Sequence, residues 1–253
     1  MKPTHRKWIS GLSVLAFLAI WEILVVTGGV KVGDVSRPTL VVKSFFELTA
    51  SGEIFQNLII SLRSFFMGFA GALVVGIPLG VVVGHYRRPA LVLDPMVMAI
   101  YTVPRMAMLP LLVVWFGVGL GANAALVFFS GLFPIIINTS VGIREVDQTY
   151  VGVVRSFGGS EWDVWTKVLL PGSLRQIISG IRLGVGRGIL GMVVGEMYTG
   201  TEGIGGRIRV YGNSFRTSEL IALITIVSIL SFLMMELFQW LERRVKGHQA
   251  EKV

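Results

Sequence analysis

Long apolar runs separated by short polar segments dominate the chain. Residues 64–86 contain no Asp, Glu, Lys or Arg, and residues 106–143 form a second uncharged run that is almost long enough for two membrane spans. A helix needs about 20 mostly apolar residues to cross a bilayer. Glycines between residues 117 and 121 divide the second run and favour a hairpin. The pattern predicts six membrane-spanning helices, at residues 8–28, 64–85, 92–116, 122–143, 178–199 and 218–240.

The composition supports an all-α membrane protein. Hydrophobic residues make up 53% of the 253-residue chain and charged residues only 15%, against about 25% charged residues in ordinary globular domains. The chain contains no cysteine, which excludes disulfide scaffolds, thiolate metal sites and thiol nucleophiles. We therefore expect a helical bundle that buries most of its surface in a membrane.

The basic residues predict how the chain is oriented. The formal net charge is +8. If the N-terminus is inside, 15 of the 23 arginines and lysines fall in cytoplasmic segments and 7 fall outside. Cytoplasmic loops carry an excess of Lys and Arg, so we expect both termini in the cytoplasm. Because this bias accounts for the positive charge, we do not expect a nucleic-acid partner.

Small residues recur at every fourth position in two of the predicted helices. They are Gly76, Gly80 and Gly84 in the second helix, and Gly180, Gly184 and Gly188 in the fifth. This spacing lets helix backbones approach closely along one face. In the second helix it favours packing within one subunit. In the fifth helix, packing and the lining of a path or subunit interface remain equally open.

Motifs for catalysis and cofactor binding are absent from the sequence. Residues 186–191 fit G-x-G-x-x-G, but they lie in an apolar segment without the preceding strand that a dinucleotide site requires. The sequence has no phosphate loop, no zinc-binding H-E-x-x-H and no G-x-S-x-G motif. We expect no cofactor, no metal site and no enzymatic activity in this chain, which argues against a membrane-embedded enzyme.

The longest predicted cytoplasmic loop, residues 144–176, has the pattern of two short helices. Residues 150–157 form the first, Gly158 stops it, and Ser160 caps a second helix with an apolar stripe. The stripe comprises Trp162, Trp165, Val168 and Leu169. Pro171 is expected to end this helix and to hold Leu170 outside the helical region. From these features alone, docking to a partner protein and resting on lipid headgroups are equally favoured.

The same loop resembles the coupling loop of bacterial ABC-importer permeases, whose pattern is E-A-A-x3-G-x9-I-x-L-P. Gly158 takes the glycine position, Val168 replaces the isoleucine, and Leu170 and Pro171 supply the final pair. Residues 152–154 read Gly-Val-Val, so the acidic residue of the pattern is missing. Residues 103–111 and 115–119 are similar to the third-helix signature of the nitrate/sulfonate/taurine class of these permeases, and residues 194–197 with 202–205 resemble the end of its fifth helix.

The resemblance implies the ABC type I importer permease fold in a bacterial inner membrane, with the loop between helices 4 and 5 as the coupling loop. Its implied partners are cytoplasmic ATP-binding subunits, a periplasmic or lipid-anchored solute-binding protein, and a second copy of the chain. The implied domains are an anchor helix with a periplasmic connecting segment (1–63), a five-helix core (64–240) and a cytoplasmic tail (241–253).

The implied activity is import of a small solute by alternating access. A nitrate-, sulfonate- or taurine-like anion is the first candidate, and a neutral or cationic vitamin precursor is the second. A secondary transporter is a third possibility, but it leaves the two-helix loop unexplained. The residues expected to couple the chain to the ATPase are Arg155, Gly158, Glu161, Trp162, Leu170 and Pro171.

Arg105 and Glu196 are candidate path residues, because ionisable side chains within membrane spans are costly and usually functional. Arg105 stands between Pro104 and Pro110, where we expect the third helix to break and free polar backbone groups. The alternative is a structural ion pair between Arg105 and Glu196, or a contact of Arg105 with the freed carbonyls.

Overall fold

The computed structural model describes residues 3–28, 35–200 and 202–250, and these residues fold into helices without strands. The elements are α1 (Pro3–Val26), α2 (Pro38–Ala50), α3 (Glu53–His85), α4 (Arg87–Thr102), η1 (Arg105–Met108), α5 (Leu109–Phe116), α6 (Leu120–Arg144), α7 (Gln148–Ser156), α8 (Glu161–Val164), η2 (Trp165–Leu169), α9 (Leu170–Thr199), α10 (Gly203–Asn213) and α11 (Thr217–Ala250). Three lysines of the charge balance, Lys2, Lys31 and Lys252, lie outside the described residues.

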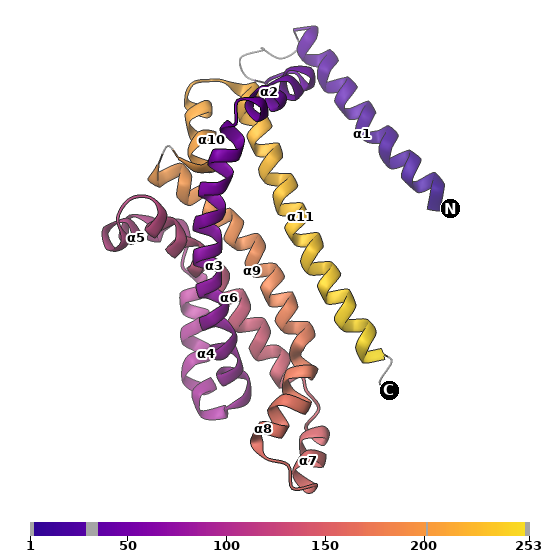
Figure 1. The fold of residues 1–253 in the computed structure, drawn as a ribbon, viewed down its shortest axis with the longest axis vertical. Coiled ribbons are helices and arrows are strands. Elements are labelled where there is room, and N and C mark those ends of the chain that lie inside the picture. The colour runs from indigo at the N-terminus through magenta and orange to yellow at the C-terminus, as the bar shows by residue number, and fades with distance from the viewer. Residues whose placement is uncertain (1–2, 29–34, 201, 251–253) are drawn as a thin grey trace.

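The centre of the molecule is a bundle of α3, α6 and α9, with α11 packed along α9 (Figure 1). The main core joins Phe65 and Phe69 of α3, Ile135 of α6, and Val185 and Met192 of α9. Helices α2 and α10 lie at one end of the bundle, and α7 and α8 lie at the other (Figure 1). Helix α1 packs on α2 and points away from the bundle (Figure 1).

The small residues of α3 and α9 set how closely the three central helices approach. A Cβ atom on Gly80 would lie 2.6 Å from the Thr139 Cβ and 2.8 Å from the Ile136 carbonyl oxygen. On α9, a Cβ on Gly180 would lie 2.7 Å from the Asn138 Cβ. Gly76, Gly84, Gly184 and Gly188 make similar approaches to α6 or α3. These glycines therefore lie at contacts within one subunit.

Four helical stretches are long and apolar enough to cross a membrane, namely Glu53–His85, Leu120–Arg144, Glu161–Thr199 and Thr217–Trp240. The third span, predicted over residues 92–116, is broken. Residues Arg87–Thr102 and Arg105–Phe116 meet at an angle of 87°, as the prolines around Arg105 led us to expect. The apolar part of α1, Leu12–Val26, is shorter than a full span.

Two helices extend beyond their predicted ends. The second predicted span starts at Glu53 rather than near residue 64, because residues 54–62 continue the apolar helical pattern and Gly52 starts the helix in a left-handed conformation (φ 77°). The predicted connecting segment is therefore mostly helix, in α2 and the start of α3. Helix α11 continues to Ala250, so the predicted tail is helical, and residues 251–253 lie outside the described part.

The prediction that Pro171 ends the loop helix is wrong. Leu170 has helical backbone angles (φ −63°, ψ −50°), and Pro171 lies in the first turn of α9. The preceding residues Trp165–Leu169 widen into a π-helical turn, in which the Leu170 amide donates to the Trp165 carbonyl. The Ser173 hydroxyl donates to the Leu169 carbonyl at 2.7 Å. These bonds satisfy polar backbone groups near a proline that has no amide hydrogen.

Candidate functional site

Helices α7 and α8 form a hairpin whose turn is held by local hydrogen bonds. The Asp147 carboxylate caps α7 by accepting from the Thr149 amide at 2.8 Å. Ser160 and Asp163 form a reciprocal capping box at the start of α8. Gly158 stands between the helices with φ 75°, a conformation that disfavours side chains with a Cβ. The hairpin expected from the sequence is therefore present.

The hairpin buries one apolar side against the bundle and exposes another. Val151, Val164 and Leu169 are buried together with Ile143 at the end of α6. Phe157 and Trp162 are 88% and 74% exposed. The sequence pattern placed Trp162 in the same stripe as Leu169, whereas in the structure Trp162 points outward. Large exposed aromatic side chains at the end of a bundle are typical of a protein-docking surface.

Two oppositely charged residues of the hairpin, Arg155 and Glu161, interact with each other. An Arg155 Nη atom lies 2.8 Å from Glu161 Oε1, joining the end of α7 to the start of α8. Both side chains are more than half exposed, so water screens the pair and its contribution to stability is small. Both charges remain accessible to a partner protein.

The second helix of the hairpin is continuous with a membrane span. Residues Glu161–Thr199 form one helical stretch of 39 residues through α8, η2 and α9. Leu170 and Pro171 lie inside this stretch. The Trp165 ring also lies 4.8 Å, centroid to centroid, from the ring of His85 at the end of α3. A force applied to α8 would therefore act directly on α9 and on the end of α3.

Arg105 lies at the bend between α4 and α5. Its guanidinium carbon is 5.0 Å from the centroid of the Tyr101 ring. Its Nε and one Nη atom are buried and have no hydrogen-bond partner among the described residues. Burying such donors without a partner is unfavourable, so the bend leaves the hydrogen-bonding capacity of Arg105 unsatisfied.

Glu196, near the end of α9, is 1% exposed and holds three elements together. Its carboxylate accepts from the Ser61 hydroxyl at 2.8 Å, the Ser64 hydroxyl at 3.4 Å, and the Gly205 amide of α10 at 2.9 Å. The bonds that hold it thus come from α3 and α10. No ion pair with Arg105, the structural alternative weighed from the sequence, occurs in the described residues.

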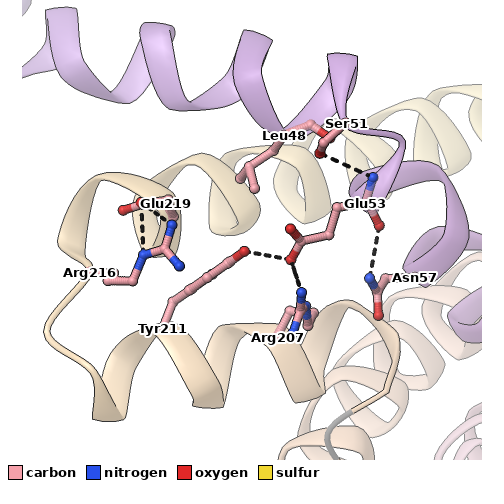
Figure 2. A network of polar contacts seen from close by, with 8 residues as sticks. All are labelled: Leu48, Ser51, Glu53, Asn57, Arg207, Tyr211, Arg216 and Glu219. Atoms are coloured by element: carbon pink, nitrogen blue, oxygen red, sulfur yellow. Dashed lines mark hydrogen bonds and ion pairs between the residues drawn. The ribbon is translucent and has the colours of Figure 1, made fainter.

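A second polar network, at the α2–α10 end, was missed by the sequence reasoning (Figure 2). Glu53 at the start of α3 accepts from Arg207 Nε at 2.6 Å and also from the Tyr211 hydroxyl. The Arg216 guanidinium lies 4.6 Å from the centroid of the Tyr211 ring and bonds Glu219. Burial, reinforced by the bond to Glu53, raises the pKa of Tyr211 to about 12. The glycine directly before Glu53 is the one local signal in the sequence that a helix starts there.

Comparison with known proteins identifies the family. The model of the binding-protein-dependent transport system inner membrane component matches residues 76–247 of this chain. The chain belongs to this family. As in its relatives, it is a permease subunit of an ABC importer in the inner membrane and not an enzyme. ATP hydrolysis belongs to separate ATP-binding subunits, and the family name implies a solute-binding protein as a further partner.

Three curated relatives are similar over most of the permease. SsuC of Bacillus subtilis, named for aliphatic sulfonates transport, is 33% identical over 96% of this chain and 90% of its own length. The taurine transport system permease protein TauC of Escherichia coli is 31% identical over 78% of this chain and 72% of its own length. The nitrate import permease protein NrtB of Leptolyngbya laminosa is 31% identical, over 96% and 89%.

Solved structures support the fold. An inward-facing MetNI methionine ABC transporter matches with a TM-score of 0.68 at 18% identity, over 76% of this permease and 95% of that chain. An amino acid ABC transporter matches with a TM-score of 0.59 at 16% identity, over 81% of this permease and 98% of that chain. The all-α type I importer permease architecture expected from the sequence is therefore confirmed.

Proposed function

We propose that this permease works as a homodimer that imports a small anion, with the α7–α8 hairpin docked on the ATP-binding subunits. The observation that carries this proposal is the continuous helix from α8 through α9. Closure of the ATPase dimer would move the docked hairpin, and this helix would pass the movement to the membrane bundle. Two alternative packings of the bundle would then open the path to one side at a time.

The hairpin offers a surface suited to this docking. Phe157 and Trp162 provide exposed apolar area, and the neighbouring pair Arg155 and Glu161 provides charges of both signs. The missing acidic residue of the coupling pattern removes one polar contact, and Arg155 and Glu161 replace it in our proposal. The hairpin faces the cytoplasm in this arrangement, with both termini on the same side, as the distribution of basic residues predicts.

An anionic solute agrees with the solutes in the names of the relatives and with the positive charge at the bend near Arg105. The relatives are named for sulfonates, taurine and nitrate. Two donor nitrogens of Arg105 lack an acceptor among the described residues, and they are closed off from solvent here, so a sulfonate or nitrate group would reach them only when the bend opens. Arg105 is therefore our path residue, whereas the bonds of Glu196 favour a role in holding the outer end of α9.

A second copy of the chain provides a place for α1. This helix points away from the bundle, and most of its apolar side chains from Leu12 onward are exposed (Figure 1). Its attachment runs through Glu22, which accepts from the Thr39 amide and hydroxyl at 3.2 and 2.9 Å. Packing of α1 on the partner permease would cover this apolar surface.

Reconstitution tests the proposal. The permease, its ATP-binding subunit and its solute-binding protein are placed in proteoliposomes, and uptake of labelled sulfonate, taurine and nitrate is measured with and without ATP. ATP-dependent uptake of at least one anion is the expected result. Uptake of none of them, together with uptake of a cation, would contradict the anionic solute. Crosslinking that yields only a single permease per complex would contradict the homodimer.

A further inference from the structure

A cavity of about 280 Å³ lies between α4, α6 and α9, away from the hairpin. Tyr101 of α4, Asn138 of α6, and Leu183 and Arg187 of α9 form part of its lining. The cavity combines a cation, a phenol and an amide with apolar walls. Small-molecule sites commonly have this character, with a few placed polar groups in an apolar pocket.

The charge balance counted Arg187 among the cytoplasmic residues, but the structure places it deep within a membrane span. Each residue advances a helix by about 1.5 Å, so Arg187 is roughly 18 Å from Thr199 at one end of α9 and roughly 25 Å from Leu170 at the other. Its side chain is exposed and forms no ion pair in the described residues. A guanidinium at this depth is costly in lipid, so this face of α9 must border water, a solute or another subunit.

The other polar groups of the cavity complement the cation. The hydroxyl of Tyr101 has no hydrogen-bond partner among the described residues. The guanidinium carbon of Arg105 lies 5.0 Å from the centroid of the Tyr101 ring. Asn138 donates through Nδ2 to the Pro134 carbonyl at 2.9 Å, which leaves its oxygen free to accept. Two donors for an oxyanion and one acceptor for a donor group thus meet in one cavity.

We propose that this cavity is a binding station of the translocation path, in which Arg187 and Tyr101 hold the oxyanion end of the solute and Asn138 accepts from its donor group. The fitting ligand is a small organic oxyanion that also carries an amine or hydroxyl, such as an aminoalkanesulfonate. Bare nitrate satisfies only half of these contacts. The inference rests on the proposed import of anions and adds the residues and the solute class.

Cysteine chemistry offers a direct test, because the natural chain contains no cysteine. An Arg187→Cys variant is reconstituted with its ATP-binding subunit and solute-binding protein, and uptake of an aminoalkanesulfonate is measured. We expect uptake to fall about tenfold or more, since hydrogen bonds to a charged group are among the strongest. A cationic methanethiosulfonate reagent should label the introduced thiol and restore uptake. An anionic reagent should label it without restoring uptake.

The matched control is Arg88→Cys, which removes an exposed arginine at the start of α4 and should leave uptake unchanged before and after labelling. Tyr101→Phe should lower uptake in the same direction as Arg187→Cys. The wild-type complex should also transport the aminoalkanesulfonate faster than nitrate.

Each contrary result has one meaning. Normal uptake by Arg187→Cys, or a thiol that neither reagent reaches, would overturn the binding station while anion import by the wild type stands. Equal uptake of nitrate and aminoalkanesulfonate would overturn the role of Asn138. If the wild type imports no anion, the proposed function itself fails.

Discussion

The carboxylate of Glu196 accepts a hydrogen bond from the backbone amide of Gly205 at 2.9 Å, which fixes the start of α10 to the end of α9. Gly203 makes this approach possible, because a Cβ at that position would lie 2.5 Å from the Glu196 carboxyl carbon. Ser61 joins the same cluster by donating to Glu196 and accepting from the Ile204 amide. These bonds therefore tie α3, α9 and α10 together at this end of the bundle.

Replacing this carboxylate should destabilise the permease. In Glu196→Ala the amide and hydroxyl donors lose their acceptor, at a cost of about 1–3 kcal/mol for each buried donor left unpaired. Glu196→Gln retains one oxygen and should fall between the alanine variant and wild type. Tryptophan fluorescence during heating in detergent measures the melting temperature. Glu202→Ala, at an exposed site without a side-chain cap bond, is the control. Equal melting temperatures of wild type and all variants would contradict the structural role of Glu196.

The guanidinium of Arg105 should affect transport more than stability. Arg105→Gln removes the charge beside Tyr101, and we expect ATP-dependent anion uptake to fall about tenfold, the usual scale for a lost charge-assisted bond. Arg105→Lys should retain part of the rate, since a lysine keeps the charge without the planar fork. Initial uptake rates in proteoliposomes measure both effects. Unchanged rates in Arg105→Gln would exclude Arg105 from the path.

A leucine at position 158 should uncouple ATP hydrolysis from transport. Gly158 has φ 75°, and an added Cβ there has no atom within 4 Å, so we expect the substitution to act mainly through backbone strain of about 1–3 kcal/mol. Relief of this strain would change the angle between α7 and α8. We expect ATPase activity with little uptake. Gly152→Leu provides the matched control, because it adds the same side chain at a helical position where a Cβ also has no atom within 4 Å. Full coupling in Gly158→Leu would argue against docking through this hairpin.

Charge reversals at Arg155 and Glu161 can distinguish a role in stabilising the hairpin from a role in contacting the ATP-binding subunit. An exposed pair contributes about 0–1 kcal/mol, so reversing either charge should leave the melting temperature nearly unchanged. We expect Arg155→Glu and Glu161→Arg each to weaken binding of the ATP-binding subunit in a pull-down. The double reversal restores the internal pair but not the contacts to the partner, so binding should stay weak. If the double variant instead binds the ATP-binding subunit normally, the pair acts only within the hairpin and does not contact the partner.

The network around Glu53 should lose stability at high pH. Burial and the bond to Glu53 raise the pKa of Tyr211 to about 12 from an ordinary value of 10.0. A raised pKa favours the neutral phenol in the folded chain, so this contribution is complete below pH 10 and is lost as the pH approaches 12. The melting temperature of wild type should therefore converge with that of Tyr211→Phe over this interval. A constant difference between the two would contradict the assignment.

The sequence by itself determined the features that depend on neighbouring residues. Uncharged runs such as residues 106–143 predicted membrane helices, and their division at Gly117 appears as the turn between α5 and α6. The Ser160–Asp163 cap and the helices flanking Gly158 are also local, because capping and helical periodicity act within four residues. The prolines around Arg105 likewise predicted the break in the third span.

Only the tertiary structure decided which groups meet. Glu196 and Ser61 are separated by 135 residues, and Glu53 and Tyr211 by 158, so no local pattern reveals that they bond. Pro171 continues a helix that local rules end, because a π-helical turn and the Ser173 hydroxyl satisfy the backbone around it. Trp162 points outward although its spacing matches Leu169, because Val164 fills the contact with the bundle. Burial and pairing depend on how distant helices pack, and that packing is a property of the whole fold.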